Sequence, residues 1–137
     1  MKIVPFDAWH LAAITPQEAQ HGEVEYGEAA EYGDAYAATV EGVPVAVGGL
    51  VDLGNGTAYA WALLSTEAGP HLLRITREIR FRLDQSPFAR IEMAVDAKFL
   101  HGCRWAERLG FSFARSDFLA DGRPAYIFER VKCHSQT

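Results

Sequence analysis

The sequence predicts one domain of the mixed α/β class (α+β), in which strands and amphipathic helices follow one another. Three β-rich runs lie in succession between residues 34 and 64, joined by glycine-containing turns. Further along, two amphipathic helical stretches flank a strand of period two, and a hairpin closes the chain. With 137 residues and 49% hydrophobic content, the chain can build one core. We expect a domain over residues 1–132 and a frayed tail over 133–137.

The N-terminal part predicts a short strand and a helix. Residues 2–6 favour an edge strand, because Pro5 has no N–H to donate within a sheet. A helix is expected over residues 9–14, with Thr15 and Pro16 opening another turn. Residues 17–34 have no clear period, so helical pieces and a loop both stay open there, and with them the role of residues 15–34.

Glycines mark the turns of the three consecutive strands. The Glu41-Gly42 pair predicts a tight hairpin, and residues 53–57, with the sequence LGNGT, predict a second one. Gly48 and Gly49 interrupt the middle strand, which suggests a bulge or a close approach by another backbone. We therefore expect a three-stranded antiparallel meander.

An amphipathic helix of about 14 residues follows the meander and is expected to end near Ser86. Its apolar positions recur at helical spacing: Leu72, Ile75, Ile79 and Leu83. Residues 89–96 then alternate apolar and polar side chains, as in a half-buried strand.

The last third of the chain predicts a helix and a hairpin. The helix is expected over residues 97–110, with Gly110 at its C-terminal cap. Strands are expected over residues 111–120 and 123–132, linked by the strong turn signal Asp121-Gly122.

The charges divide the chain into two parts. Residues 3–73 hold ten acids and no base, whereas residues 74–137 hold twelve bases and eight acids. A nucleic-acid-binding domain would present a net basic surface, and this chain has a net charge of −5. A solvated acidic loop and a partner-facing acidic surface both remain open for the first part.

The sequence has no pattern that predicts a membrane segment, a secretion signal or a metal site. The sequence has no run of 18 apolar residues and no secretion signal, so we expect neither membrane insertion nor secretion. Cys103 and Cys133 are expected to be free thiols, and no Cys/His spacing predicts a metal site. The three tryptophans, Trp9, Trp61 and Trp105, are expected in the core.

The element order and the phrase RLGF at residues 108–111 resemble the GNAT family of N-acetyltransferases. The resemblance implies a mixed, mostly antiparallel sheet of six to seven strands flanked by about four helices. It also implies that the third meander strand pairs with the pantetheine arm of acetyl-CoA, at Ala62, Leu63 and Leu64. A loop before the next helix would bind the pyrophosphate with its amides.

That loop departs from the family pattern, which has Gln or Arg, two residues, Gly, one residue, and Gly or Ala. The proposed cofactor positions here are Thr66, Gly69, His71 and Arg74. Pro70 lacks an amide, and the carboxylate of Glu67 would repel phosphate. The alternative is that the segment only starts a helix, with Thr66 or Gly69 near its N-cap. Binding of acetyl-CoA therefore stays open.

The resemblance leaves catalysis open as well. The usual family tyrosine, which protonates the departing thiolate, falls at Ala106. No general base stands out, and the candidates are Asp52, Glu92 and His101.

A second resemblance covers residues 35–130 and is to the small phage proteins that include the internal virion protein of T7-type bacteriophages. Its features are the glycine-rich middle strand, the helix phrase from His101 to Gly110, and the hairpin at Asp121-Gly122. It implies a phage or prophage protein with a virion or assembly role, an eroded catalytic site and other phage structural proteins as partners. The host cytoplasm and the virion would be its locations, and a homodimer is plausible. The alternative is an active N-acetyltransferase that uses acetyl-CoA.

Overall fold

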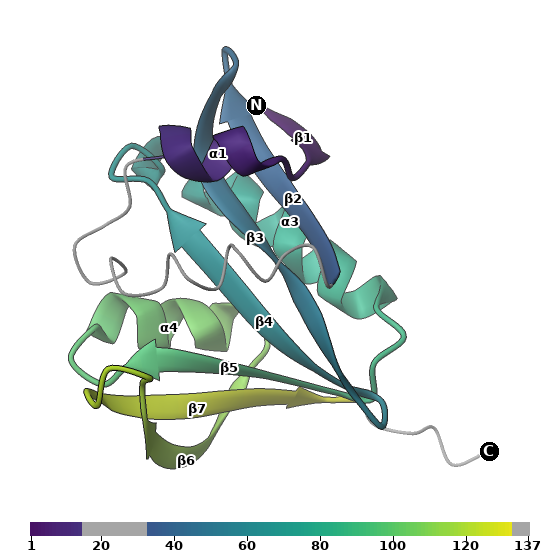
Figure 1. Ribbon diagram of the computed structural model, residues 1–137, viewed down its shortest axis with the longest axis vertical. Helices are drawn as coiled ribbons and strands as arrows, with labels where there is room; N and C mark the ends of the chain where they lie inside the picture. Colours follow the sequence, from purple (N-terminus) through teal and green to yellow (C-terminus); the bar gives the residue numbers. More distant parts are fainter. Residues whose placement is uncertain (15–32, 133–137) are drawn as a thin grey trace.

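The computed structural model describes residues 1–14 and 33–132, which form a mixed sheet with helices on both faces (Figure 1). The strands are β1 (Lys2–Pro5), β2 (Gly33–Val40), β3 (Val43–Gly54), β4 (Thr57–Leu64), β5 (Arg90–Asp96), β6 (Ser112–Phe118) and β7 (Pro124–Val131). The helices are α1 (Ala8–Ala13), α3 (Leu72–Gln85) and α4 (Leu100–Arg108), and a 3-10 turn, η3 (Gly69–His71), precedes α3. The predicted class and element order are confirmed. The described residues contain three α-helices, where about four were expected.

The seven strands lie in the order β1-β2-β3-β4-β5-β7-β6. Every neighbouring pair is antiparallel except β4 and β5, which are parallel. The sheet is therefore mixed and mostly antiparallel, as predicted. The strand that contains Pro5 is an outer one, because β1 pairs only with β2 among the described residues.

The predicted turns are present. Glu41 and Gly42 have φ values of +51° and +81°, the conformation of a tight mirror-image hairpin turn. The Gly48-Gly49 pair reflects a close approach of neighbouring strands. A Cβ atom would lie 2.8 Å from the carbonyl oxygen of Trp61 at Gly48 and 2.2 Å from that of Asp34 at Gly49. Register shifts, which mark bulges, lie elsewhere in the meander.

Two apolar clusters hold the sheet between the helices. On one face, α3 and α4 share a cluster with the sheet that includes Ile75, Leu83, Met93 and Trp105. On the other face, residues of β2–β4 pack with the chain around α1 in a cluster that includes Ile14, Val47, Trp61 and Leu63. Figure 1 shows α1 in front of the sheet and α3 behind it.

The tryptophan prediction holds for two of three residues. Trp61 and Trp105 are 4% and 7% exposed, whereas Trp9 is 50% exposed. In α1 the buried side chain is that of His10, and the neighbouring Trp9 points to another side of this short helix. The Trp9 ring lies 4.0 Å from the His10 ring, centroid to centroid.

The helix predicted over residues 97–110 is shorter than expected and begins at Leu100. Asp96 accounts for the late start. Its carbonyl oxygen accepts the N–H of Phe99, and its Oδ1 accepts the N–H of Lys98, so these residues form a side-chain-stabilised turn. The predicted end is confirmed, since Gly110 follows α4 with a φ of +94°.

Candidate functional site

The two central strands β4 and β5 part from each other after a short parallel contact. They pair only at Thr57–Arg90, Ala58–Ile91 and Tyr59–Glu92. Beyond these pairs the strands diverge toward their carboxyl ends, which Figure 1 shows as an open angle in the sheet. A sheet interrupted in this way leaves room for a ligand between two strands, at the end where α3 and α4 begin.

A cavity of about 90 Å³ lies in this angle. Its walls are largely apolar and include Ala60, Ala62, Leu64, Val95, His101 and Gly102. A Cβ atom at Gly102 would lie 2.6 Å from the ring of Phe99 and 2.9 Å from a methyl group of Val95. The glycine therefore allows α4 to lie close to β5 and sets the width of the cleft on that side.

Two of the three predicted cofactor positions of β4 line the cleft, and the third does not. Ala62 and Leu64 line the cleft. Leu63 does not, because its side chain is fully buried in the cluster on the α1 face. Successive side chains of a strand point to opposite faces, so only every second residue can reach one cavity.

The loop from Ser65 to His71 forms a compact helical start. The hydroxyl oxygen of Ser65 accepts the N–H of Glu67 at 3.1 Å. The N–H of His71 donates to the Ala68 carbonyl at 2.9 Å, and that of Leu72 donates to Gly69. These amides are therefore engaged in the 3-10 turn. The turn begins at Gly69 with Pro70 in its first positions, and Ala68 precedes it without a capping side chain. Of the two residues expected near the N-cap in the helix-start alternative, Gly69 therefore lies next to it.

The other predicted cofactor residues surround this turn. Thr66, Gly69 and Arg74 are exposed, and His71 is half-buried. No heavy atom lies within 4 Å of the position that a Cβ atom would take at Gly69, so the surface beside this backbone is open. None of the four residues lines the cleft itself. They lie between the end of β4 and the first turn of α3, at the mouth that the resemblance assigns to phosphates.

Two of the three candidate bases are engaged with neighbouring groups. Asp52 is exposed, and its Oδ1 accepts the N–H of Gly54 at 2.8 Å, which closes the β3–β4 turn. Glu92 lies at the last position where β4 and β5 pair. Its Oε1 is 3.0 Å from guanidinium nitrogens of both Arg90 and Arg115.

The third candidate, His101, lines the cleft from the first turn of α4 and is exposed to solvent. Tyr59, which sequence reasoning did not single out, also lines the cleft and stands opposite Glu92 where the strands part. Its position depends on where the parallel pairing stops, and no local sequence signal gives that point.

The family tyrosine position is part of the core. Ala106 is completely buried, and the neighbouring Trp105 lines the cleft instead. The indole Nε1 of Trp105 donates to the hydroxyl of Thr76 at 2.8 Å, and this hydroxyl donates to the carbonyl of Leu72 at 2.7 Å. The indole N–H thus ties α4 to α3.

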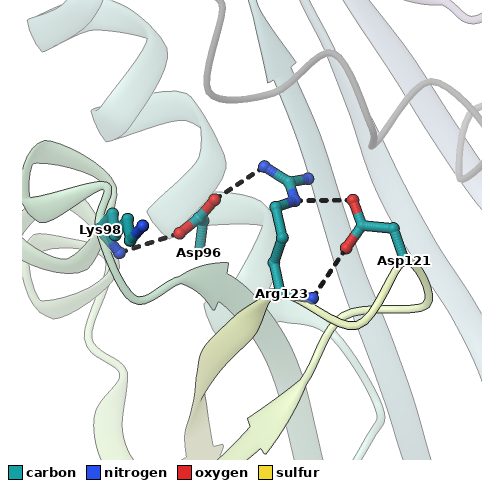
Figure 2. A network of polar contacts seen from close by, with 4 residues as sticks. All are labelled: Asp96, Lys98, Asp121 and Arg123. Atoms are coloured by element: carbon teal, nitrogen blue, oxygen red, sulfur yellow. Dashed lines mark hydrogen bonds and ion pairs between the residues drawn. The ribbon is translucent and has the colours of Figure 1, made fainter.

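A polar network connects the end of β5, the turn before α4 and the β6–β7 hairpin (Figure 2). Asp96 is 7% exposed at the end of β5, and its Oδ2 lies 2.8 Å from Nη1 of Arg123. Nε of Arg123 lies 2.6 Å from Oδ2 of Asp121. The pKa of Asp121 is lowered, chiefly because its carboxylate accepts the backbone N–H of Arg123. The network fixes the turn from which α4 starts.

Three further features of the residues that the structure describes concern metal binding, membrane crossing and the reactivity of a thiol. They contain no group of three or more His, Cys, Asp or Glu side chains that could hold a metal ion. Over the same ranges, no helix has the length and apolar character that a membrane crossing requires. Burial raises the pKa of the Cys103 thiol, and the carboxylates of Glu107 and Asp96 raise it further.

The backbone resembles solved acetyltransferase structures along almost its entire length. The ribosomal-protein-S18-alanine N-acetyltransferase of Escherichia coli superposes with a TM-score of 0.73 at 18% identity, covering 98% of this chain and 96% of that one. An IAA acetyltransferase from Bacillus cereus gives 0.73 at 12% identity, covering 96% and 99% of the two chains. A Bacillus subtilis acetyltransferase in complex with CoA gives 0.72 at 12% identity, with the same coverage.

Neither a protein-family profile nor a curated protein matches the sequence. At these identities the structural likeness concerns the fold. The chain has the fold of the GNAT acetyltransferases, with the parted β4 and β5 strands at its centre.

Proposed function

We propose that this protein is an acyl-CoA-dependent N-acyltransferase, with acetyl-CoA as the simplest donor and an amine as the acceptor. The observation that carries the proposal is the end of β4–β5 pairing after three residue pairs, together with the cavity of about 90 Å³ between the parted strands. Neighbours of the same fold are acetyltransferases, and one of them is described in complex with CoA.

The pantetheine arm and the phosphates of such a donor would contact different kinds of residues. Small apolar side chains, those of Ala60 and Ala62, suit the slender pantetheine arm inside the cleft. Gly69 and Arg74 are the proposed phosphate residues, because the backbone at Gly69 is open and Arg74 is an exposed cation one turn further on. Glu67, also exposed, opposes phosphate binding, so we expect moderate rather than tight affinity.

When bound, acetyl-CoA supplies the acetyl group, which forms a C–N bond with the amine as the C–S bond breaks. His101 is the proposed proton donor to the sulfur, since its imidazole is the exposed proton carrier in the cleft wall. Glu92 is the proposed acceptor of the amine proton through water, with Arg90 and Arg115 holding its carboxylate in place.

The test combines ligand stabilisation with turnover. A ligand that binds only the native state at 100 times its dissociation constant stabilises it by about 2.7 kcal/mol, so acetyl-CoA should raise the melting temperature. Thiol release should then appear with one of three amines: a peptide with N-terminal alanine, spermidine or an aminoglycoside. These follow the names of neighbours of the same fold.

The matched variant is Gly69→Trp, since the open space at Gly69 tolerates a side chain and an indole there would cover the proposed phosphate site. It should abolish the effect of acetyl-CoA and leave the unliganded melting temperature within about 2 °C of wild type. Absence of any shift with millimolar acetyl-CoA would contradict the proposal.

The second candidate is a phage or prophage protein with a virion or assembly role and no catalysis. Two observations favour it: Ala106 is buried where the family has its tyrosine, and loop amides are engaged within η3. The outer strand β6 also presents exposed Phe113 and Phe118, suited to contacts with other phage structural proteins or a second copy. The phage assignment rests on sequence resemblance, and with it the proposed location in the host cytoplasm and the virion. Co-purification of the chain with assembled particles would test it.

A further inference from the structure

A second and larger cavity lies between α3 and the sheet. Its volume is about 350 Å³, and Ile75 and Ile79 of α3 form part of its roof. The floor, from β2, β3 and β4, is made of small residues: Ala38, Ala46, Gly48, Ala60 and Ala62. At Gly48 no larger residue fits, because a Cβ atom would lie 2.8 Å from the Trp61 carbonyl.

The larger cavity is accessible to solvent. Ala60 and Ala62 belong to the central strand of the sheet, yet both are only half-buried. An apolar cavity of about 150 Å³ in another protein binds benzene, and this one has roughly twice that volume. The cavity runs from β2 to β5. The paired strands β2, β3 and β4, about 4.8 Å apart, account for about 10 Å of this distance, and the parted strand β5 adds to it. Such a volume spread over such a length suits a linear aliphatic chain.

The larger cavity adjoins the cleft between β4 and β5. The two share six lining residues: Ala60, Trp61, Ala62, Leu64, Met93 and Trp105. At the far end, the guanidinium of Arg82 lies 3.9 Å from the ring centroid of Tyr36 and 3.0 Å from a carboxylate oxygen of Glu78. The cavity therefore has the proposed thioester site at one end and, at the other, Arg82 in an ion pair with Glu78, with Asp34 also in the wall.

We infer that this cavity binds a linear aliphatic chain of roughly 8 to 12 carbons. The chain would enter as the acyl group of a CoA thioester, which rests on the proposed function, or as a free carboxylic acid whose carboxylate replaces that of Glu78 at Arg82. In the first case the preferred donor is a medium-chain acyl-CoA, and acetyl-CoA uses only the cleft.

The test is a titration series on the full chain with acetyl-, octanoyl- and decanoyl-CoA, and with octanoic and decanoic acid, all below their micellar concentrations. Burying one methylene is worth about 0.8 kcal/mol, so the affinity should rise up to about fourfold for each added carbon. Isothermal titration calorimetry measures the dissociation constants of the CoA esters and of the free acids. The shift of the melting temperature measures how far each ligand stabilises the protein.

Ile79→Trp is the blocking variant, because Ile79 lines the larger cavity and not the cleft. Val43→Trp is the control, at a position of β3 that is 51% exposed and outside both cavities. Ile79→Trp should remove the dependence on chain length and keep acetyl-CoA binding, whereas Val43→Trp should change neither. If Ile79→Trp does not fold, Ala46→Leu fills the same cavity from the floor.

The outcomes separate this inference from the proposed function. Binding of decanoic acid that Ile79→Trp abolishes, without binding of any CoA ester, supports the cavity and contradicts the acyltransferase. Binding of acetyl-CoA without a gain from longer chains, and without binding of either acid, overturns the inference and leaves the acyltransferase standing. A dimer that Ile79→Trp dissociates, in a protein that binds no acid, assigns the cavity to a second copy and also overturns the inference.

Discussion

Nη1 of Arg123, in the β6–β7 hairpin, lies 2.8 Å from Oδ2 of Asp96, the last residue of β5. The carboxylate is buried to 7% exposure, and its other oxygen accepts the N–H of Lys98 (Figure 2). One carboxylate thus joins the hairpin to the turn that begins α4. Because α4 contributes one wall of the cleft, this contact also sets the geometry of the proposed site.

Arg123→Ala should destabilise the protein. The buried carboxylate of Asp96 would lose a charged donor, and a buried polar group left without its partner costs about 1–3 kcal/mol. Chemical denaturation measures this loss in the free energy of unfolding. The control is Asp121→Asn, which removes the charge of the exposed partner of Arg123 and should cost clearly less than Arg123→Ala. Equal losses in the free energy of unfolding would show that the buried Asp96–Arg123 contact contributes no more to stability than the exposed Asp121–Arg123 contact.

Gly102→Ala should lower the stability although alanine is the better helix former. The exchange gains up to about 1 kcal/mol of helix propensity. The new methyl group, however, would meet the ring of Phe99 at 2.6 Å and Val95 at 2.9 Å, and overpacking of a core costs about 1–3 kcal/mol. We expect a net loss in thermal denaturation, together with weaker acetyl-CoA binding as α4 moves.

Gly69→Ala is the matched control for this substitution. No atom lies within 4 Å of the added carbon, so the free energy of unfolding should stay within about 0.5 kcal/mol of wild type. A Gly102→Ala protein as stable as wild type would contradict the expected overpacking, because α4 would then accommodate the methyl group without a loss in the free energy of unfolding.

The fold was predictable where a local signal decides the structure. The period of Leu72, Ile75, Ile79 and Leu83 gives α3 its length, and the positive φ of Gly42 follows from a turn that needs such a residue. The start of α4 was mispredicted because the side chain of Asp96 stabilises a turn that helix periodicity does not report. Trp9 was mispredicted because a hydrophobic residue does not by itself reveal which side of a two-turn helix is covered.

The site was predictable in part. Ala62 and Leu64 do line the cleft, and the period of the strand alone was enough to place Leu63 on the other face. Tyr59 could not be found, since its place depends on the register at which β4 and β5 stop pairing. The same holds for Asp96, whose partner Arg123 lies 27 positions away. The large cavity arises from small residues on three strands and from α3 together, which no single segment encodes.

Cys103 should react slowly with alkylating agents at neutral pH. Burial, and then the carboxylates of Glu107 and Asp96, raise the pKa of this thiol, and only the thiolate is nucleophilic. In a Cys133→Ser background, the rate of iodoacetamide labelling should reach half its maximum at a pH above the usual thiol value of about 8.5.

The same shift predicts a decline of stability in alkali. The folded thiol keeps its proton to a higher pH than the unfolded one, so the unfolded state binds fewer protons between the two pKa values. The free energy of unfolding should therefore fall as the pH rises above about 8.5, and Cys103→Ala should reduce that decline. A labelling midpoint at or below the usual value would contradict both expectations.

His101→Gln should separate catalysis from binding. His101 lines the cleft and is exposed, so the substitution removes a proton carrier without opening the core. If His101 protonates the departing sulfur, turnover of acetyl-CoA should fall about 10²–10⁴-fold while the dissociation constant of CoA changes little. Arg104→Gln, exposed on the same helix and outside the cleft, is the control and should keep the wild-type rate. Full turnover in His101→Gln would move the proton donor to another group of the cleft, where Tyr59→Phe is the variant to measure next.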